Sequence, residues 1–220
     1  MKRPTLMIYV TDSSSRKMQN SIQELEWSKK LSLVRSREYL FSRGHARYFI
    51  STIKNISPLE VPLISPPGEP PTLKNNFGFL SISHCKRCCL IGWSKFPLGV
   101  DIENINRDLL AKEILNKYYS VEERSLLNKY DLNKLKKIVF DYWLIKEASF
   151  KLRGGNLLSE LKNLIVNQNN KTVLNKELLL TNSYLIKSFK DWRIAVSFDM
   201  NINITETFIC YSNLENKHRS

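Results

Sequence analysis

The sequence predicts an α+β protein in which helices and small antiparallel sheets alternate along the chain. Two observations lead to this prediction. A helical stretch over about residues 22–54 is followed by three short apolar segments, and a second group of helices over residues 109–153 is followed by six more. The chain has 220 residues, 42% of them hydrophobic, which is enough for one large domain or two small ones.

The first group of elements begins with the helical stretch 22–54, which is rich in polar residues. Residues 58–71 are rich in proline and predict an extended loop. Segments 77–83 and 88–94 are apolar and separated by a short basic turn, so they predict a β-hairpin, and 98–103 predicts a third strand. The seam between the two halves of the chain is expected directly after this strand.

The second group opens with a helix over 109–119. Ser120 and Glu123 then form a capping-box pattern that begins a short helix. A long helix is expected over 132–153, which contains no Pro or Gly and is followed by Gly154-Gly155. Six strand candidates complete the chain: 164–166, 172–174, 178–180, 184–189, 192–198 and 207–211.

Two carboxylates share one face of the strand at 98–103. Leu98, Val100 and Ile102 alternate with polar positions, so Asp101 and Glu103 point to the same side. Two like charges at that spacing repel each other, and a bound cation removes the repulsion. Carboxylate oxygens suit magnesium. The alternative is a solvated edge strand with two surface acids.

The long helix carries two stripes. The first is apolar and is expected to be buried; it comprises Leu135, Ile138, Tyr142, Ile145 and Leu152. The second comprises Trp143, Glu147 and Lys151, each four residues from the next. An exposed Glu–Lys pair that slightly stabilises the helix would explain two of these three residues but not the tryptophan. Lys146, beside Glu147, could face either a ligand phosphate or solvent.

The formal net charge of +13 favours an acidic partner, which could be nucleic acid, an anionic membrane, a polyphosphate or an acidic protein. Three of the four cysteines lie at Cys85, Cys88 and Cys89, and the fourth is Cys210. A zinc cluster would need a second ligand pair, so free cysteines in a reducing cytoplasm are expected. The sequence shows no secretory signal and no apolar run of membrane-spanning length.

Four motifs in the same order resemble the 4′-phosphopantetheinyl transferases, and specifically their two-half, single-chain Sfp-type class. Gly99 to Glu103 reads Gly-Val-Asp-Ile-Glu, and Trp143 to Lys151 reads Trp-x-x-Lys-Glu-Ala-x-x-Lys. The segment 79–84 resembles the family's Ser-His segment, and 43–47 resembles the basic helix of its first half. The resemblance covers about residues 43–166.

The resemblance implies a chain folded as two similar α+β halves packed as a pseudo-dimer, over residues 1–106 and 107–220. It also implies the activity of a holo-[acyl-carrier-protein] synthase. Such an enzyme moves the phosphopantetheine arm of coenzyme A onto a serine of a carrier protein and releases adenosine 3′,5′-bisphosphate.

The resemblance also implies the site residues. Asp101, Glu103 and Glu147 would hold Mg²⁺, with Mn²⁺ as the alternative ion. Glu147 would act as the base, directly or through a metal-bound water, and Lys151 would assist the leaving phosphate. Coenzyme A would be bound by Arg43, Arg47, Ser83, His84, Asp101 and Lys151.

One segment departs from the family's pattern. Where the family has a basic Gly-Lys-Pro segment, this chain has Gly68-Glu69-Pro70, so an acid replaces a base. Lys74 is the nearest candidate substitute. No site residue is assigned to this loop.

The implied macromolecular partner is an acidic acyl or peptidyl carrier protein, met by a monomeric cytoplasmic enzyme without nucleic acid or membrane. Two competing interpretations remain. A magnesium-dependent nuclease would also combine acids with a lysine, although usually on adjacent strands. A non-enzymatic basic nucleic-acid-binding module would suit the net charge, although the sequence contains no helix-turn-helix signature.

Overall fold

The computed structural model describes residues 5–10, 18–85, 88–154, 158–200 and 208–212 of the chain. The chain forms two compact units, one of Met1–Phe96 with Ile204–Ser220 and one of Pro97–Asn203. The seam therefore precedes the acidic strand instead of following it between residues 106 and 107. The physical reason is hydrogen bonding, because this strand pairs with a strand near residue 195 and so belongs to the second unit.

The first unit combines two helices with a four-stranded sheet in the order β11-β1-β5-β4. Its neighbouring strands pair antiparallel except β1 and β11, which are parallel, so this sheet is mixed and not purely antiparallel as predicted. Its elements are β1 (Thr5–Val10), α1 (Ile22–Ser28), α2 (Leu33–Lys54), the 3-10 helix η1 (Pro58–Glu60), β2 (Leu63–Ile64), β3 (Thr72–Leu73), β4 (Phe79–Cys85), β5 (Cys88–Ser94) and β11 (Phe208–Ser212).

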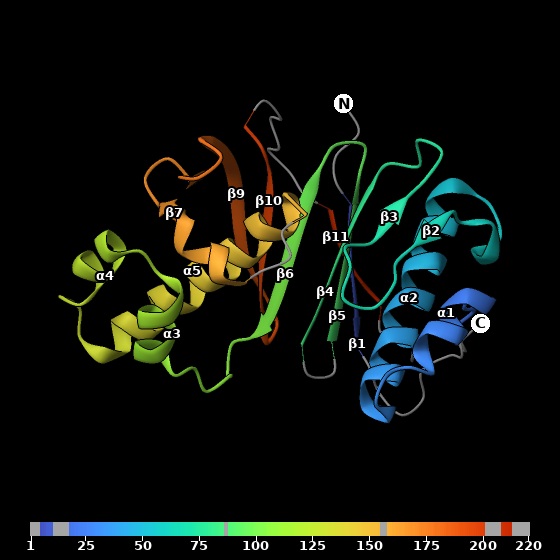
Figure 1. Cartoon of the computed structure of the whole chain (residues 1–220), viewed down its shortest axis with the longest axis horizontal. Helices are drawn as coiled ribbons and strands as arrows, with labels where there is room; N and C mark the ends of the chain where they lie inside the picture. The colour runs from blue at the N-terminus through green and yellow to red at the C-terminus, as the bar shows by residue number, and fades with distance from the viewer. Residues whose placement is uncertain (1–4, 11–17, 86–87, 155–157, 201–207, 213–220) are drawn as a thin grey trace. The chain divides into compact units, whose positions relative to one another are not determined.

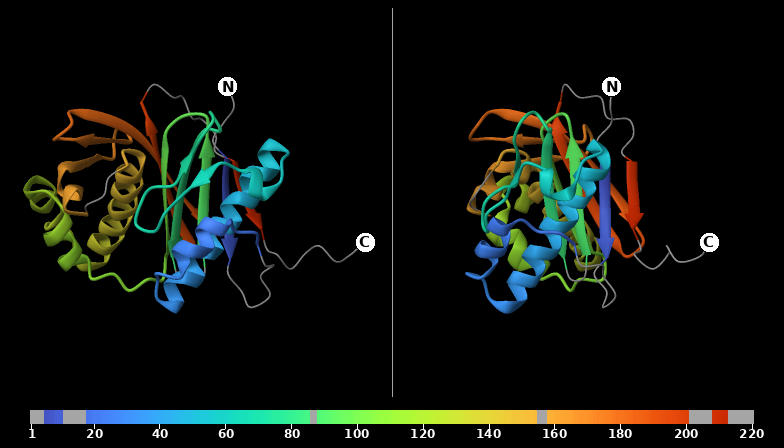
Figure 2. Two further views of the ribbon diagram at one scale, coloured as in Figure 1. Left: turned by 45° about the vertical axis from the view of Figure 1, so that its right-hand side comes forward. Right: turned by 90° about the vertical axis from the view of Figure 1, so that its right-hand side faces the viewer.

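The predicted helical stretch 22–54 is two helices. Ser21 and Glu24 form a capping box that begins α1. Ser32 lies in an extended conformation and begins α2, so the chain is not helical between the two. Figure 2 shows α2 beside the sheet of this unit. Its buried face joins β4 and β5 in a core made of Ala46, Phe49, Ile50, Val61, Leu63, Leu80, Cys89, Ile91 and Trp93.

The second unit has a five-stranded antiparallel sheet in the order β6-β10-β9-β8-β7. The long helix α5 packs against β6 and β10, and Figure 1 shows the helix crossing this sheet. The elements are β6 (Leu98–Asn104), α3 (Ala111–Tyr118), α4 (Val121–Leu127), α5 (Leu132–Leu152), the 3-10 helix η2 (Leu158–Asn163), β7 (Leu164–Asn167), β8 (Thr172–Asn175), β9 (Leu180–Phe189) and β10 (Trp192–Asp199).

One strand candidate of this unit is a turn. Residues 178–179 are not part of a strand, and β9 begins at Leu180. The side chain of Asn175 accepts hydrogen bonds from the backbone N–H groups of Glu177 and Leu178, both at 3.0 Å, and this holds the chain in the turn. The apolar composition of 178–180 therefore gave a misleading strand signal.

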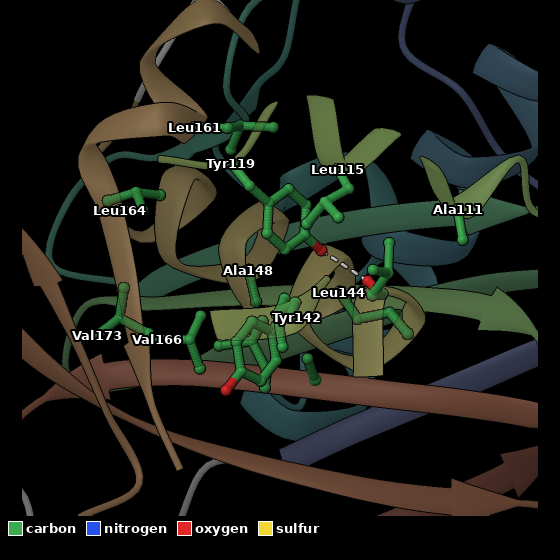
Figure 3. Packing of buried hydrophobic residues seen from close by; sticks show 14 of the residues in the cluster. Ala111, Leu115, Tyr119, Tyr142, Leu144, Ala148, Leu161, Leu164, Val166 and Val173 are labelled. Atoms are coloured by element: carbon green, nitrogen blue, oxygen red, sulfur yellow. Dashed lines mark hydrogen bonds between the residues drawn. The ribbon is translucent and has the colours of Figure 1, made fainter. Parts of the chain in front are cut away.

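The helix α5 has defined ends. The carboxylate of Asp131 accepts hydrogen bonds from the backbone of Asn133 and Lys134 at 3.0 Å and caps its first turn. At the other end Gly154 adopts a φ of 69°, which glycine tolerates without strain. The apolar side of α5 enters the core of the unit (Figure 3), where the Tyr119 hydroxyl donates to the carbonyl of Val139 at 2.7 Å.

These features make the protein α+β, with a sheet and a long helix in each unit. Among the helices in the described ranges, none combines the length and apolar character needed to span a bilayer.

Candidate active site

The acidic pair lies on β6, an edge strand of the second unit's sheet. Asp101 pairs with Ala195 on β10, and Glu103 pairs with Arg193. Asp101 is 5% exposed, while Glu103 is partly buried. Val100 and Ile102 are buried as the alternation predicts. The two acids are therefore not solvated surface residues, and their burial needs a compensating charge.

Gly99 explains why α5 comes so close to this strand. A Cβ atom at this position would lie 1.9 Å from the carbonyl oxygen of Ala148 and 2.5 Å from the backbone nitrogen of Leu152. The backbones of β6 and α5 are therefore in direct contact at Gly99, and any side chain at this position would force them apart. Glu147 and Lys151 directly precede those two helical residues, so this contact brings them to the strand that carries the acids.

Two cations accompany the acids. The Nζ of Lys151 donates to Oδ1 of Asp101 at 2.7 Å, with exposed side-chain fractions of 29% and 7%. Arg107, four residues after Glu103, forms an ion pair with it. The contact between Lys151 and Asp101 joins the α5 stripe to the strand that carries Asp101, and Arg107 is a second cation that the sequence analysis did not name.

The pKa values describe one electrostatic cluster, which we call the acidic cluster: Asp101, Glu103 and Glu147. Burial raises the pKa of Glu147 to about 7, and the charges of Asp101 and Glu103 add to this effect, while Lys151 and Arg107 oppose it. Burial also raises the pKa of Glu103, against the effect of Arg107. A carboxyl group poised near neutral pH is suited to exchange a proton.

The carboxylates of the acidic cluster are the ligands that the sequence predicts for a divalent cation. Within the described part of the chain, no three His, Cys, Asp or Glu side chains are placed so that they could hold a metal ion together. Lys151 and Arg107 instead supply positive charge to two of the carboxylates. The donor chemistry fits a hard cation, since three carboxylates repel one another across buried space. To hold one ion together, these three side chains would have to move closer to one another.

Trp143 belongs to the protein interior. It is partly buried, packs against the core of the second unit and meets Tyr118 edge to face, with ring centroids 5.0 Å apart. The tryptophan of the second stripe therefore anchors α5 near the end of α3.

The structure contradicts both predictions made for Lys146 from the sequence. It faces neither a ligand nor solvent, because its side chain is fully buried and its Nζ donates to the carboxylate of Glu123 at 2.6 Å. Burial lowers the pKa of Lys146, while the charge of Glu123 raises it. No spacing in the sequence indicates this pair, and the capping-box pattern predicts only the local role of Glu123.

In the first unit, Arg43 and Arg47 lie on α2 in different environments. Arg43 donates from Nη1 to the Ser42 hydroxyl at 3.0 Å, and its guanidinium lies 4.6 Å from the centre of the Tyr39 ring. Its buried Nε has no hydrogen-bond partner among the described residues. Burial lowers the pKa of Arg43. This guanidinium has unused donor capacity for an anion.

The guanidinium of Arg47 is engaged by the protein itself. Its Nε lies 2.9 Å from Oε2 of Glu24, and both side chains are nearly inaccessible, 4% and 1% exposed. Its two remaining nitrogens donate to the carbonyls of Val61 at 2.8 Å and Leu63 at 3.2 Å, with a weaker bond to Pro58. This arrangement favours a structural role for Arg47 over contact with a ligand.

Ser83 and His84 lie on β4, opposite Leu90 and Cys89 of β5. Ser83 is buried at 3% exposure, while His84 is exposed. The turn at Gly68 lies on the surface with Glu69 and Pro70 exposed, and Lys74 is exposed as well. Each of these residues belongs to the first unit.

The three cysteines near His84 carry no disulfide. Cys85, Cys88 and Cys89 are not joined in disulfides, and the last two are buried. The described residues offer no metal-binding group that would include them. The side chain of Cys210, on β11, lies outside the described residues.

Comparison with known proteins gives one family. The model of the 4′-phosphopantetheinyl transferase superfamily matches residues 97–197, a stretch that begins just before β6 and ends within β10. No protein in the curated collection matches the chain. The matched stretch contains the whole acidic cluster together with Lys151 and Arg107.

Proposed function

Residues 97–197 form a domain of the 4′-phosphopantetheinyl transferase superfamily, and from this premise we propose a specific reaction for the chain. It transfers the 4′-phosphopantetheine group from coenzyme A to a serine hydroxyl of an acyl or peptidyl carrier protein and releases adenosine 3′,5′-bisphosphate. The observation that carries the proposal is the contact of α5 with the acidic strand, where Lys151 donates to Asp101 at 2.7 Å and where burial and the charges of Asp101 and Glu103 raise the pKa of Glu147 to about 7.

The serine hydroxyl needs a base because it is a weak nucleophile at neutral pH. Glu147 is the group proposed for this role. Its pKa of about 7 leaves a substantial fraction ionised at neutral pH, and the same raised pKa makes it a stronger base than an ordinary carboxylate. The serine oxygen attacks the phosphorus that carries the pantetheine arm, the bond from that phosphorus to the nucleotide phosphate breaks, and Glu147 takes the hydroxyl proton.

The leaving nucleotide phosphate gains negative charge as that bond breaks. Lys151 is the residue proposed to stabilise this charge, because its side chain is partly exposed and its ammonium contacts Asp101 of the acidic cluster. Asp101, Glu103 and Glu147 are the residues that would hold Mg²⁺ or Mn²⁺, and such an ion supplies neutralisation of the diphosphate charge when bound. Asp101 would then exchange its contact with Lys151 for the ion.

Coenzyme A carries further phosphates, and the first unit supplies candidates for binding them. Arg43 is the stronger of the two arginines, because its guanidinium keeps a buried donor without a partner, whereas Arg47 is fully engaged. His84 offers an exposed ring beside the buried hydroxyl of Ser83. We assign Arg43, Ser83 and His84 to coenzyme A and leave Arg47 out.

The subclass, the setting and the carrier complete the proposal. We infer the two-half, single-chain class acting as a monomer, supported by a sheet and a long helix in each compact unit. A cytoplasmic location accords with the absence of a disulfide at Cys85, Cys88 and Cys89. Carrier proteins are acidic as a class, so a net charge of +13 would steer them to this enzyme.

The nuclease interpretation receives less support from the geometry. It would place the lysine on a strand adjacent to the acids, whereas Lys151 lies on α5 and reaches the strand from the helix. No observation favours a nucleic-acid-binding module over the transferase.

Intact mass analysis tests the proposal. The chain is incubated with coenzyme A, Mg²⁺ and several purified carrier proteins that lack the arm, and each carrier is then weighed. We expect one carrier to gain the mass of a single phosphopantetheine, and to gain nothing when its acceptor serine is replaced by alanine or when the metal is chelated. Unchanged masses for acyl and peptidyl carriers alike, together with magnesium-dependent cleavage of DNA, would favour the nuclease.

A further inference from the structure

We propose that the buried Lys146–Glu123 ion pair is a positioning device that fixes the rotation of α5 and thereby holds Glu147 against β6. The inference rests on the proposed function, because it concerns the geometry of the proposed base. The hydrogen bonds of both residues are made to α3, α4, η2 and β7 and not to the acidic cluster, so both would act through the helix and not on the substrate.

The ammonium of Lys146 is fully satisfied. It donates to Oε2 of Glu123 at 2.6 Å, to the carbonyl of Leu161 at 3.1 Å and to the carbonyl of Tyr118 at 3.4 Å. It also lies 4.2 Å from the centre of the Tyr119 ring. An ammonium has three N–H donors, and here three acceptors meet them.

Glu123 also makes several hydrogen bonds. Its carboxylate accepts from Lys146, from the backbone N–H of Ser120 at 3.1 Å and from the backbone N–H of Val166 at 3.3 Å. Through these bonds the pair connects α5 to the end of α3, the start of α4, η2 and β7. The ion pair thus fixes the position of α5 relative to four other elements.

Because the ion pair is buried, it tolerates only one placement of α5. A different rotation or sliding of α5 would remove the ammonium from its acceptors while leaving it without water, which is strongly unfavourable. A hydrophobic side chain at the same place could be buried in several orientations at similar cost. The ion pair therefore specifies one placement of the helix, as buried polar groups do when they fix register.

A second contact restrains the same helix from another side. Gly99 lets the backbone of β6 touch α5 at Ala148 and Leu152, while Lys146 points to α3 and α4. Lys146 and Glu147 are adjacent in sequence and so lie about 100° apart around the helix axis. Fixing the direction of one side chain fixes the direction of the other.

The test removes the pair without leaving a buried charge. In the double variant Glu123→Met with Lys146→Met, both charges are replaced by apolar side chains of similar volume, which is often tolerated in protein interiors. The matched control is Glu122→Met with Lys176→Met, which removes a Lys–Glu pair of 2.8 Å that lies on the surface and does not involve α5.

Three quantities are measured on each variant: the thermal unfolding midpoint, the kcat and KM of carrier modification, and the affinity of the chain for Mn²⁺ in the presence of coenzyme A. We expect the double variant to fold, to keep its KM for coenzyme A, and to lose about tenfold or more in kcat and in Mn²⁺ affinity. The control pair should leave all three unchanged. Wild-type kcat and Mn²⁺ affinity in a folded double variant would overturn the proposal.

A second variant guards against a double variant that does not fold. Glu123→Asp keeps both charges and shortens only the reach of the carboxylate by one methylene. A reduced kcat at unchanged KM is expected, and wild-type kcat would count against positioning. If the wild-type chain modifies no carrier, the proposed function fails, whereas the Mn²⁺ comparison still decides whether the pair positions the acidic cluster.

Discussion

The two lysines that flank Glu147 on α5 differ in almost every respect. Lys146 is completely buried, and its ammonium meets three acceptors around Glu123. Lys151 keeps 29% of its side chain exposed and contacts Asp101 beside two further carboxylates. One helix thus supplies a closed ion pair that holds the fold together and an open one that can exchange partners. Burial separates these roles, although both residues are lysines of a single motif.

The same contrast occurs on α2 in the first unit. Arg47 is enclosed with Glu24 and backbone carbonyls, whereas Arg43, one turn earlier, keeps a buried donor unpaired. In both helices the less deeply buried of the two cations is the one we assign to chemistry. We therefore expect substitutions of the more exposed residues to change activity, and substitutions of the enclosed ones to change stability first.

The largest effect is expected at the base. Glu147→Gln keeps the size of the side chain but removes its charge and its capacity to take a proton. We expect carrier modification to fall by at least about 10²-fold, the usual contribution of a general base. Glu122→Gln on the surface of α4 is the matched control. Near-wild-type rates in Glu147→Gln would show that another group activates the serine.

Asp101 provides the next comparison, between an open and a structural carboxylate. Asp101→Asn should raise the magnesium concentration needed for half-maximal transfer by about tenfold or more. Asp141→Asn is the control. Asp141 lies on the same helix as Glu147, and its carboxylate accepts two hydrogen bonds from Arg193 of β10. Its magnesium requirement should not change. The comparison fails if both variants respond alike.

Gly99 tests whether close backbone contact places the helix. Gly99→Ala would put a methyl group 1.9 Å from the carbonyl oxygen of Ala148, so α5 must move. We expect a loss of about 1–3 kcal/mol or more in the free energy of unfolding, measured by urea titration, together with loss of transfer. Gly68→Ala, at a φ of 83° with no atom within 4 Å, should cost only about 1–2 kcal/mol and leave transfer intact.

The raised pKa of Glu147 predicts how stability depends on pH in the metal-free protein. Its folded pKa of about 7 lies above its ordinary value of 4.5, so between these values the folded state binds more protons than the unfolded state. The free energy of unfolding should therefore decrease as pH rises from 4.5 to 7, by roughly 2–3 kcal/mol from this group. In Glu147→Gln this part of the pH dependence should be absent from thermal unfolding curves.

Salt should have the smallest effect. Carrier modification at limiting carrier concentration is expected to slow by a few-fold with added salt, because screening weakens the attraction between a +13 chain and an acidic domain. The affinity for coenzyme A should change less. Equal salt sensitivity of the two quantities would argue against electrostatic steering.

Several features of the second unit could be predicted because their signals are local. Strand alternation put Asp101 and Glu103 on one face, and helical spacing aligned Glu147 with Lys151. The capping box at Ser120 and the bounds of α5 were also predicted, because caps and periodicity depend on near neighbours.

The errors came from long-range contacts. The partner of Lys146 lies 23 residues away and the partner of Arg47 lies equally far, so no spacing rule reveals that both cations are enclosed. The unit boundary was misplaced because β6 pairs with β10, almost a hundred residues later. Gly99 was recognised as part of a motif, but its contact with α5 is visible only in the fold.

We propose that Asp101, Glu103 and Glu147 move together to hold one divalent ion when coenzyme A is bound. Electron paramagnetic resonance of Mn²⁺ measures this binding directly, with the wild-type chain, Asp101→Asn and Asp141→Asn titrated in the presence of coenzyme A. We expect one bound Mn²⁺ per chain in the wild type and in Asp141→Asn, and an affinity for Mn²⁺ at least tenfold weaker in Asp101→Asn. Equal Mn²⁺ affinity in all three proteins, or no bound Mn²⁺ in any, would contradict it.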